Sequence, residues 1–322
     1  MSESPKGIPA YKDLPIIQKT GAHHNWGVFG DTDELGAINF LTQDRVKSAA
    51  KLVHDGFVVS LSLPLDLPKP QLARDRAGYA HHIERRRSGG DDKIDNFYLQ
   101  GSTQWDGLGH VRYREFGYYG GREDEDLDKG ELGIDRWAEH GIVGRGVLID
   151  LPEFASASGR TVPPNERHGI TPPELEEILS WEHTKLEGGD ILLVRTGWLS
   201  WYLSLDDEGR NGMAGRLHNE EGGMECPGLD PAEATAAWLW NNQVPAIAAD
   251  NPALEALVVR KEEGFLHRLI LPLLGMAVGE FWNLEGLSAA CKSRRRYEFL
   301  FVSAPLNIPN GLGSPGNGIA IF

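Results

Sequence analysis

Apolar runs separated by polar, glycine-rich stretches recur along the chain, and their spacing predicts a mixture of strands and helices. Runs of strand length occupy six segments, at 57–65, 144–151, 190–197, 244–250, 277–282 and 297–306. Apolar positions at helical spacing follow Thr42, and capping patterns with proline begin further helices at Thr171 and Asp230. A short helix is expected over 265–275, ended or kinked at Pro272. This order predicts an α/β protein without the regular alternation of a doubly wound sheet.

Polar stretches interrupt this pattern and are expected to be irregular. Residues 1–40 are rich in glycine, proline, asparagine and aspartate and predict an irregular N-terminal arm, followed by a single catalytic domain over 41–322. Residues 66–96, centred on ERRRSGGDDK, predict a flexible loop with solvated charges that ends in a short strand at 95–100. Residues 120–131 predict an acidic loop. The run lacks the alternating oxygen ligands of a calcium-binding loop, so no calcium site is expected there.

The composition is that of a globular protein with an acidic surface. Its 322 residues are 40% hydrophobic, enough to bury a core, and the net charge of −15 argues against nucleic acid or an anionic membrane as a partner. Two cysteines, Cys226 and Cys291, exclude a disulfide framework and fit a reducing compartment. The chain shows neither an apolar run of roughly 18 residues, as a membrane span needs, nor a secretory signal core. A cytoplasmic protein is therefore expected.

Motifs for two common enzyme classes are missing from the sequence. No glycine-rich phosphate loop stands between a first strand and a helix, and no Walker lysine follows one, which disfavours nucleotide chemistry. No Gly-x-Ser-x-Gly elbow is present, which weighs against a serine hydrolase. The chemistry must therefore be sought in other residues.

The densest group of polar residues lies in the stretch LQGSTQWDGLGHVRY, residues 99–113. Asp106 and His110 offer a carboxylate and an imidazole, which are ligands for Zn²⁺ or Mn²⁺ and groups that transfer protons. Gly107 and Gly109 disfavour a helix and let the backbone pass close to a ligand. An aspartate and a histidine in such a turn can equally be structural hydrogen-bonding groups, so the stretch alone does not decide the matter.

Two further polar residues stand in apolar surroundings near the C-terminus. His267 lies in FLHRLIL and Glu280 in AVGEFW. A glutamate in a buried strand needs a partner, a metal or a raised pKa, whereas a lone histidine can be a satisfied core residue. Glu285, in NLEGL, is the alternative acid, although its surroundings favour an exposed turn. If His267 and Glu280 converge on the glycine-rich stretch, the four side chains form a site.

These residues give the chain a resemblance to the cyclase superfamily, which includes bacterial kynurenine formamidases and isatin hydrolases. The family's metal motif runs His-x-Gly-Thr-His-x-Asp-x-Pro-x-His. Three positions of residues 100–110 match it: Thr103, Asp106 and His110. Gln100 and Gln104 stand where the family has two metal-binding histidines, and Leu108 replaces proline. Other segments extend the likeness over most of 23–322.

The resemblance implies a fold, an assembly and an activity. The expected fold is the swivelling β/β/α arrangement, a mixed sheet or flattened barrel with outer helices, in a homodimer or tetramer. The expected activity is hydrolysis of a non-peptide C–N bond, in an aryl formamide such as N-formylkynurenine or a cyclic amide, or of a lactone. A role in tryptophan catabolism follows from that substrate. Four residues are expected to contact the small-molecule substrate: Thr103, Trp105, Tyr118 and Trp198. The three aromatic ones can equally be ordinary core or interface residues.

Three interpretations of the site remain open. In the first, Asp106, His267 and Glu280 hold one divalent ion, Zn²⁺ or Mn²⁺, with Gln100 or Gln104 in support, and His110 acts as general acid or base. In the second, the site needs no metal: the amides orient the substrate and His110 acts as base, as in a lyase or dehydratase that pairs it with Glu280. In the third, the chain binds a small molecule without turnover.

Overall fold

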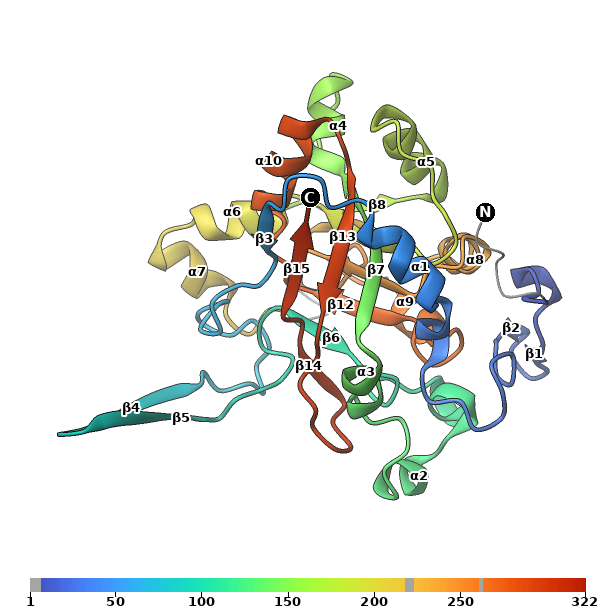
Figure 1. The fold of residues 1–322 in the computed structure, drawn as a ribbon, viewed down its shortest axis with the longest axis horizontal. Coiled ribbons are helices and arrows are strands. Elements are labelled where there is room, and N and C mark those ends of the chain that lie inside the picture. Colours follow the sequence, from blue (N-terminus) through green and yellow to red (C-terminus); the bar gives the residue numbers. More distant parts are fainter. Residues whose placement is uncertain (1–6, 218–222, 261–262) are drawn as a thin grey trace.

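A nine-stranded mixed sheet forms the centre of the protein, as its computed structural model shows (Figure 1). The structure describes residues 7–217, 223–260 and 263–322, so the first six residues of the expected arm lie outside the described part. The strands follow the order β14 (Gly313–Pro315), β6 (Gln104–Asp106), β12 (Ala277–Glu280), β11 (Ala246–Ala249), β9 (Ile191–Arg195), β7 (Ile142–Asp150), β13 (Glu298–Ser303), β15 (Gly318–Ile321) and β3 (Val58–Ser60).

The middle of the sheet is parallel and its two sides are antiparallel. Strands β12, β11, β9 and β7 run in one direction, whereas β6 and β14 on one side and β13, β15 and β3 on the other are antiparallel to their neighbours. The carboxyl ends of the parallel strands therefore share one edge, where ligands bind in open α/β sheets. Asp150, Arg195, Asp250 and Glu280 lie at that edge.

Helices surround the sheet, as expected for the fold (Figure 1). They are α1 (Gln43–Ala50), α2 (Asp124–Asp128), α3 (Asp135–His140), α4 (Leu151–Ala157), α5 (Pro172–Trp181), α6 (Trp198–Ser204), α7 (Asp207–Met213), α8 (Glu233–Asn241), α9 (Leu266–Ile270) and α10 (Glu285–Arg294). The Thr42 hydroxyl caps α1 by accepting the N–H of Arg45, as the sequence predicted. Among the described residues, no helix has the length and apolarity to cross a membrane. The mixed architecture confirms the predicted fold class.

Small paired strands lie outside the main sheet. They are β1 (Ile16–Ile17) with β2 (Ala22–His23), β8 (His168–Ile170) with β10 (Pro227–Leu229), and β4 (Ala80–Arg86) with β5 (Gly89–Asp95). The last pair is a hairpin that projects far from the body (Figure 1). The expectation of an irregular loop over 66–96 is therefore wrong for residues 80–95. Polar residues fill both of these strands, so they lack the alternating apolar pattern by which strands are recognised.

Three other local expectations are corrected. The strand expected over 57–65 is shorter, at Val58–Ser60, and of the strand expected over 95–100 only Asp95 is in a strand, as the last residue of β5. The expected acidic loop at 120–131 contains α2, which begins with a capping box in which Glu123 and Asp126 each accept a backbone N–H. Carboxylates at a helix N-terminus are favoured by the helix dipole, so this acidic run stabilises a short helix.

The described part of the N-terminal segment is irregular but packs on the body. It contains two short 3₁₀ turns, Tyr11–Asp13 and Gly36–Phe40. The indole of Trp240 on α8 donates to the carbonyl of Pro9, 2.9 Å away, and the buried Asn25 amide donates to the carbonyl of Leu274 at the same distance. These contacts between distant parts of the sequence hold the segment against the core.

A buried carboxyl beside β7 makes the stability of the fold depend on pH. Glu182 accepts the N–H of Asp150 at 2.8 Å, and burial raises its pKa to about 9. The native state thus holds this proton more tightly than the unfolded chain, whose pKa is near 4.5. The stability that this proton confers is complete below about pH 4.5 and is lost as the pH rises toward 9.

We expect Glu182→Gln to make the free energy of unfolding depend less on pH. At pH 9 the free energy of unfolding of the variant should exceed that of the wild type by about 1–3 kcal/mol, because glutamine carries no charge that must stay buried. At pH 5 the two values should be similar. Urea unfolding at pH 5, 7 and 9 measures the difference. Glu139→Gln, at an exposed position, serves as control. If the free energies of unfolding of wild type and Glu182→Gln changed with pH in parallel, Glu182 would not be the group responsible for the pH dependence.

Candidate metal centre

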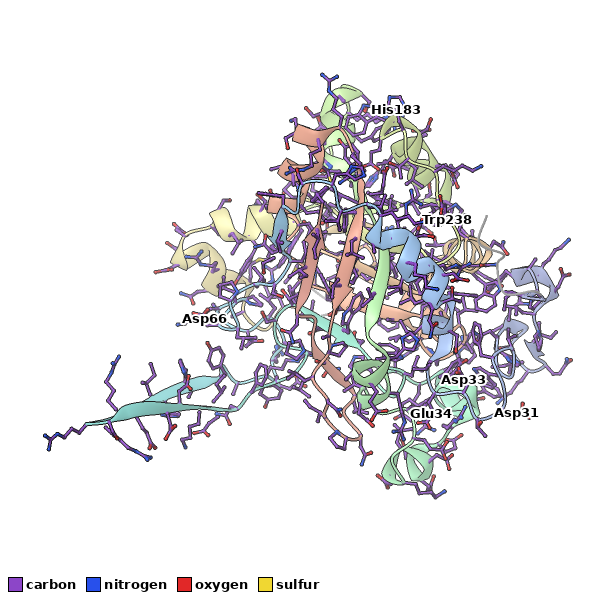
Figure 2. The ribbon with its side chains drawn as sticks, viewed as in Figure 1. Asp31, Asp33, Glu34, Asp66, His183 and Trp238 are labelled. Carbon is purple, nitrogen blue, oxygen red and sulfur yellow. The ribbon has the colours of Figure 1, made fainter. Side chains whose placement is uncertain are left out.

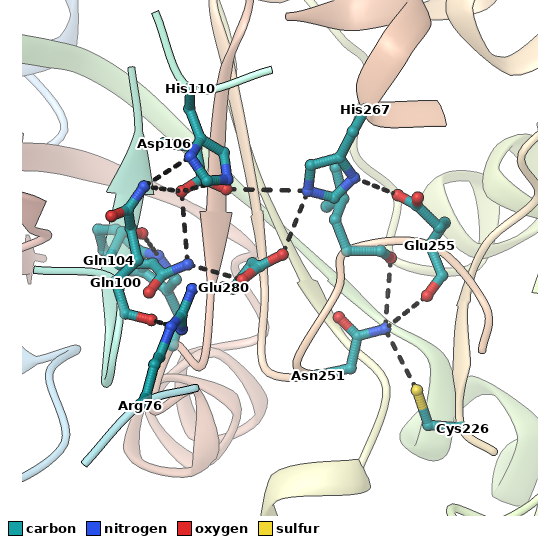
Figure 3. Close-up of polar contacts among 12 residues, drawn as sticks. Arg76, Gln100, Gln104, Asp106, His110, Cys226, Asn251, Glu255, His267 and Glu280 are labelled. Atoms are coloured by element: carbon teal, nitrogen blue, oxygen red, sulfur yellow. Dashed lines mark hydrogen bonds and ion pairs between the residues drawn. The ribbon is translucent and has the colours of Figure 1, made fainter. Parts of the chain in front are cut away.

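Strand pairing brings the glycine-rich stretch and the C-terminal segment together. In the antiparallel pair β6–β12, Gln104 lies opposite Glu280 and Asp106 lies opposite Val278. Successive side chains of a strand point to opposite faces, so Gln104 and Asp106 share the face of Glu280 whereas Trp105 points the other way. Helix α9 brings His267 to the same place (Figure 3). His267 and Glu280 therefore meet the glycine-rich stretch, which was the condition that Sequence analysis set for a site.

Asp106, His267 and Glu280 form a buried triad. The Nε2 atom of His267 lies 3.2 Å from Oε1 of Glu280 and 3.8 Å from Oδ2 of Asp106. One ligand atom from each residue lies within 4.8 Å of the other two. Glu280, not Glu285, thus joins His267: the carboxylate of Glu285 instead makes two hydrogen bonds of 2.9 Å with the Arg195 guanidinium.

The two glutamines of the motif donate hydrogen bonds to these carboxylates. Nε2 of Gln104 donates to Oε2 of Glu280 at 2.6 Å and, more weakly, to Oδ1 of Asp106 at 3.5 Å. Nε2 of Gln100 donates to Oδ1 of Asp106 at 3.2 Å. The Oε1 atom of Gln104 is buried without a hydrogen-bond partner. In this arrangement the amide nitrogens face the carboxylates. The side-chain oxygen of Gln104 can still accept a hydrogen bond or bind a cation.

His110 stands at the open side of the site. Its side chain is 30% exposed, compared with 1% for Asp106, and its Nε2 lies 3.7 Å from Oδ1 of Asp106. The Nδ1 atom of His110 lies 2.8 Å from Nε2 of Gln100. Since an amide N–H can only donate, Nδ1 accepts here and the ring proton of neutral His110 sits on Nε2. A molecule that enters from solvent would therefore meet the ring of His110 before it reaches the buried triad.

Glu255 lies behind His267 and was not anticipated from the sequence. Its Oε2 is 2.6 Å from Nδ1 of His267, and its side chain is fully buried (Figure 3). This hydrogen bond turns Nε2 toward Asp106 and Glu280, as outer carboxylates do for metal-binding histidines. The signal was present in NPALEALVV, where Glu255 is an acid in an apolar run, as Glu280 is in AVGEFW.

The charges of the site are coupled. Burial raises the pKa of Glu280 to about 7, and the Asp106 carboxylate adds to the rise. Burial lowers the pKa of His267, but the carboxylates of Glu255 and Glu280 outweigh it, so that pKa lies well above its ordinary value. Three carboxylates thus surround one imidazole in a buried space. The excess of negative charge favours a cation.

The donor set fits a divalent ion. Ligand bonds of about 2.0–2.2 Å place neighbouring ligand atoms roughly 3–3.5 Å apart. The separations of 3.2 and 3.8 Å around Nε2 of His267 are close to this range. One imidazole and two carboxylates suit Zn²⁺ or Mn²⁺, and the unpartnered oxygen of Gln104 is a further possible donor. The residues present therefore fit such an ion.

The four residues expected to contact substrate make other contacts in the structure. Thr103 is buried and ties loops together: its hydroxyl donates to the carbonyl of Phe281 at 2.6 Å and accepts the N–H of Leu63 at 2.8 Å. Trp105 and Trp198 are fully buried in the core. The Tyr118 hydroxyl donates to Asp124 at 3.0 Å. These positions give the four residues packing and bonding roles, and their contact with a substrate stays a prediction.

Comparisons with known proteins agree on the family. A sequence model of the Cyclase family, described as "Putative cyclase", matches residues 52–256. A solved structure titled as a novel cyclase is 34% identical, with a TM-score of 0.80, over 93% of this chain and 99% of that chain. A search of curated proteins returns no match.

Isatin hydrolases share the fold at lower identity. Isatin hydrolase A from Labrenzia aggregata, bound to benzyl benzoate, is 18% identical with a TM-score of 0.59, over 86% of this chain and 97% of that chain. Isatin hydrolase A from Ralstonia solanacearum is 19% identical with a TM-score of 0.57, over 82% and 91%. These two show the fold alone. The family match over 52–256 and the 34% identical cyclase structure confirm the predicted resemblance: the chain belongs to the Cyclase family.

Proposed function

We propose that this protein hydrolyses a small non-peptide amide or a lactone with the help of a divalent ion. The observation that carries the proposal is the buried triad Asp106, His267 and Glu280, with His110 at its solvent-facing side. The shared fold of the isatin hydrolases supports the same class of reaction. An aryl formamide, a cyclic amide and an aromatic lactone are the substrates to test first.

The chain's own residues supply the binding and the proton transfer. Asp106, His267 and Glu280 would hold the ion, which when bound supplies Lewis-acid activation of water and of a carbonyl oxygen. Hydrolysis joins a water oxygen to the carbonyl carbon and breaks the C–N or ring C–O bond, so the leaving atom needs a proton. The attacking water in turn loses a proton. His110, the most exposed group of the site, would donate a proton to the leaving atom as an imidazolium and take one from the attacking water as a neutral imidazole, so that the ring ends as it began.

Metal content and turnover test the proposal together. Protein purified without chelator should contain about one Zn²⁺ or Mn²⁺ per chain, measured by mass spectrometry. It should hydrolyse at least one of N-formylkynurenine, isatin and dihydrocoumarin, lose this activity after chelation and regain it with metal. Absence of turnover by the metal-loaded protein on amide and lactone panels would overturn the proposal.

Replacement of His110 should remove most of the activity. We expect His110→Ala to lower kcat by about 10²–10⁴-fold, because the leaving group loses its proton donor. The side chain is 30% exposed, so added imidazole should enter and restore part of the rate. His140→Ala, at an exposed position on α3, is the matched control and should keep full activity. Full activity in His110→Ala would reject this role.

One observation favours a second function on the same scaffold. Because both glutamine amides donate to Asp106 or Glu280, the carboxylates have hydrogen-bond partners without any cation. A metal-independent lyase that uses His110 and Glu280 is the alternative. Activity that survives exhaustive chelation and gives a product one water lighter than its substrate would establish it in place of hydrolysis.

A further inference from the structure

Arg76 places a positive charge beside the site, and neither metal binding nor proton transfer uses it. A guanidinium N–H of Arg76 donates to the backbone carbonyl of Gln100, whose side-chain amide contacts His110 (Figure 3). Burial and the neighbouring aspartate raise the pKa of Glu280, and the charge of Arg76 is among those that oppose this rise. The hydrogen bond and the electrostatic effect both place the guanidinium next to the buried triad.

No carboxylate of the described residues forms an ion pair with Arg76. The hydrogen bond of its guanidinium goes to a neutral carbonyl, although the side chain is half-buried. Arg195, which is also half-buried, instead pairs with Asp150 at 2.8 Å and with Glu285 at 2.9 Å. A charge that is partly withdrawn from water costs free energy unless a counter-ion compensates it. Arg76 therefore has the capacity to bind an anion.

Packing on both sides of Arg76 holds it in place. Leu72 and Ala73, which precede it, are buried in the core. The N–H of Leu217 donates to the carbonyl of Leu72 at 3.1 Å, and the N–H of Arg76 donates to the carbonyl of Ala73 at 3.4 Å. The backbone is thus anchored at one end of the side chain, and the carbonyl of Gln100 orients the guanidinium at the other. A charge held in this way is preorganised for a ligand.

Gln100 joins Arg76 to the group that transfers protons. Its backbone carbonyl accepts from Arg76, and its side-chain Nε2 lies 2.8 Å from Nδ1 of His110. Solvent reaches both partners, because the His110 side chain is 30% exposed and Arg76 is half-buried. The proton-transfer group and the unpaired cation are therefore attached to the same residue at the open side of the site, where one small molecule can contact both.

We propose that Arg76 is a specificity residue that binds a carboxylate group of the substrate, so that the amide or lactone hydrolysed here carries a negative charge. This inference rests on the proposed function. A guanidinium binds a planar carboxylate through paired N–H donors, and its single charge balances that of the carboxylate. Asp106, Glu255 and Glu280 would otherwise repel an anionic molecule. They would repel a phosphate dianion more strongly, which favours a carboxylate as the ligand.

Matched substrates test the role of Arg76 in turnover. The three ring isomers of formamidobenzoate differ from formanilide only by the carboxylate, and Arg76→Gln should lower kcat/KM for the best isomer about 10–100-fold, mainly through KM, because a charged hydrogen bond is lost. Hydrolysis of formanilide should stay within about twofold, and Arg76→Lys should recover part of the loss. Arg74→Gln, at an exposed position against Gly215, is the control and should change neither rate. Equal losses on charged and neutral substrates would overturn the proposal.

Calorimetric titration of the full chain with benzoate and benzamide tests the same contact without turnover. Benzoate should bind the wild type at least about 10-fold more tightly than it binds Arg76→Gln, whereas benzamide should bind the two proteins alike. Such a result in a protein that hydrolyses no amide or lactone would refute the proposed function and leave the anion site standing. Benzoate that binds both proteins equally, or does not bind the wild type, overturns the role of Arg76 even if the protein proves to be a hydrolase.

Discussion

Asp106→Asn is expected to abolish metal binding while leaving the fold intact. Asparagine keeps the size of the side chain and an oxygen that accepts the amide hydrogen bonds of Gln100 and Gln104, but it removes one of the two carboxylates that face Nε2 of His267. The affinity for Zn²⁺ or Mn²⁺ should fall by more than about 100-fold, since even outer-shell changes cost 10–100-fold. Hydrolytic activity should fall below detection.

The same variant should be at least as stable as the wild type when no metal is present. The Asp106 carboxylate raises the pKa of Glu280 because two buried negative charges repel each other. Thermal unfolding with and without added metal measures both effects: metal should raise the Tm of the wild type but not that of Asp106→Asn. Asp128→Asn, at an exposed position, is the control. A metal-induced rise of equal size in Asp106→Asn would refute the triad as the binding site.

Trp282→Ala is expected to be the most destabilising substitution near the site. The indole is fully buried, its ring lies 4.7 Å from that of Trp105, and its N–H donates to the carbonyl of Gln104 at 3.0 Å. Two glycines make room for it: a Cβ at Gly318 would lie 2.2 Å from the ring, and one at Gly316 would lie 2.6 Å from it. We expect a loss of about 3–5 kcal/mol of unfolding free energy.

Denaturant unfolding measures the loss of unfolding free energy. Two further variants separate the contribution of ring packing at Trp282 from that of its hydrogen bond and from the effect of removing any tryptophan. Trp282→Phe keeps most of the ring contacts but loses the bond to Gln104, so it should cost about 1–2 kcal/mol. Trp238→Ala, at a half-buried position of α8 (Figure 2), removes an indole whose N–H donates to Glu176, and should cost clearly less than Trp282→Ala. Equal losses for Trp282→Ala and Trp238→Ala would contradict the packing role.

The sequence predicted the triad because its members break local patterns. Glu280 is a charge in an apolar strand and His267 is an imidazole in an apolar helix, and such groups persist only with partners. Their meeting with Asp106 was conditional, because the pairing of β6 with β12 joins residues more than 170 positions apart and leaves no local trace. Glu255 is likewise a charged residue in an apolar run, but it was overlooked because it lies between the strand expected at 244–250 and the helix expected at 265–275.

The sequence failed where stabilisation comes from outside the local pattern. Most strands of the main sheet could be located by their apolar residues, because burial on the sheet requires such residues at those positions. The hairpin at 80–95 has no core to face, and its polar residues therefore resembled a loop. Trp105 illustrates a different limit. The resemblance implied a substrate contact for its indole and the sequence left a core position equally open, and the strand alternation that puts the indole in the core depends on a pairing between distant residues.

The root of the hairpin has a practical consequence for protein engineering. Ala80 and Asp95 face each other across the ribbon, so the chain leaves the body and returns to it at nearly one point. The segments that flank the hairpin are also joined to each other, because a guanidinium N–H of Arg76 donates to the backbone carbonyl of Gln100. A reporter peptide inserted at Ser88, or a short turn that replaces the whole hairpin, leaves this hydrogen bond in place. The hairpin turn is thus an insertion point that projects away from the triad Asp106, His267 and Glu280.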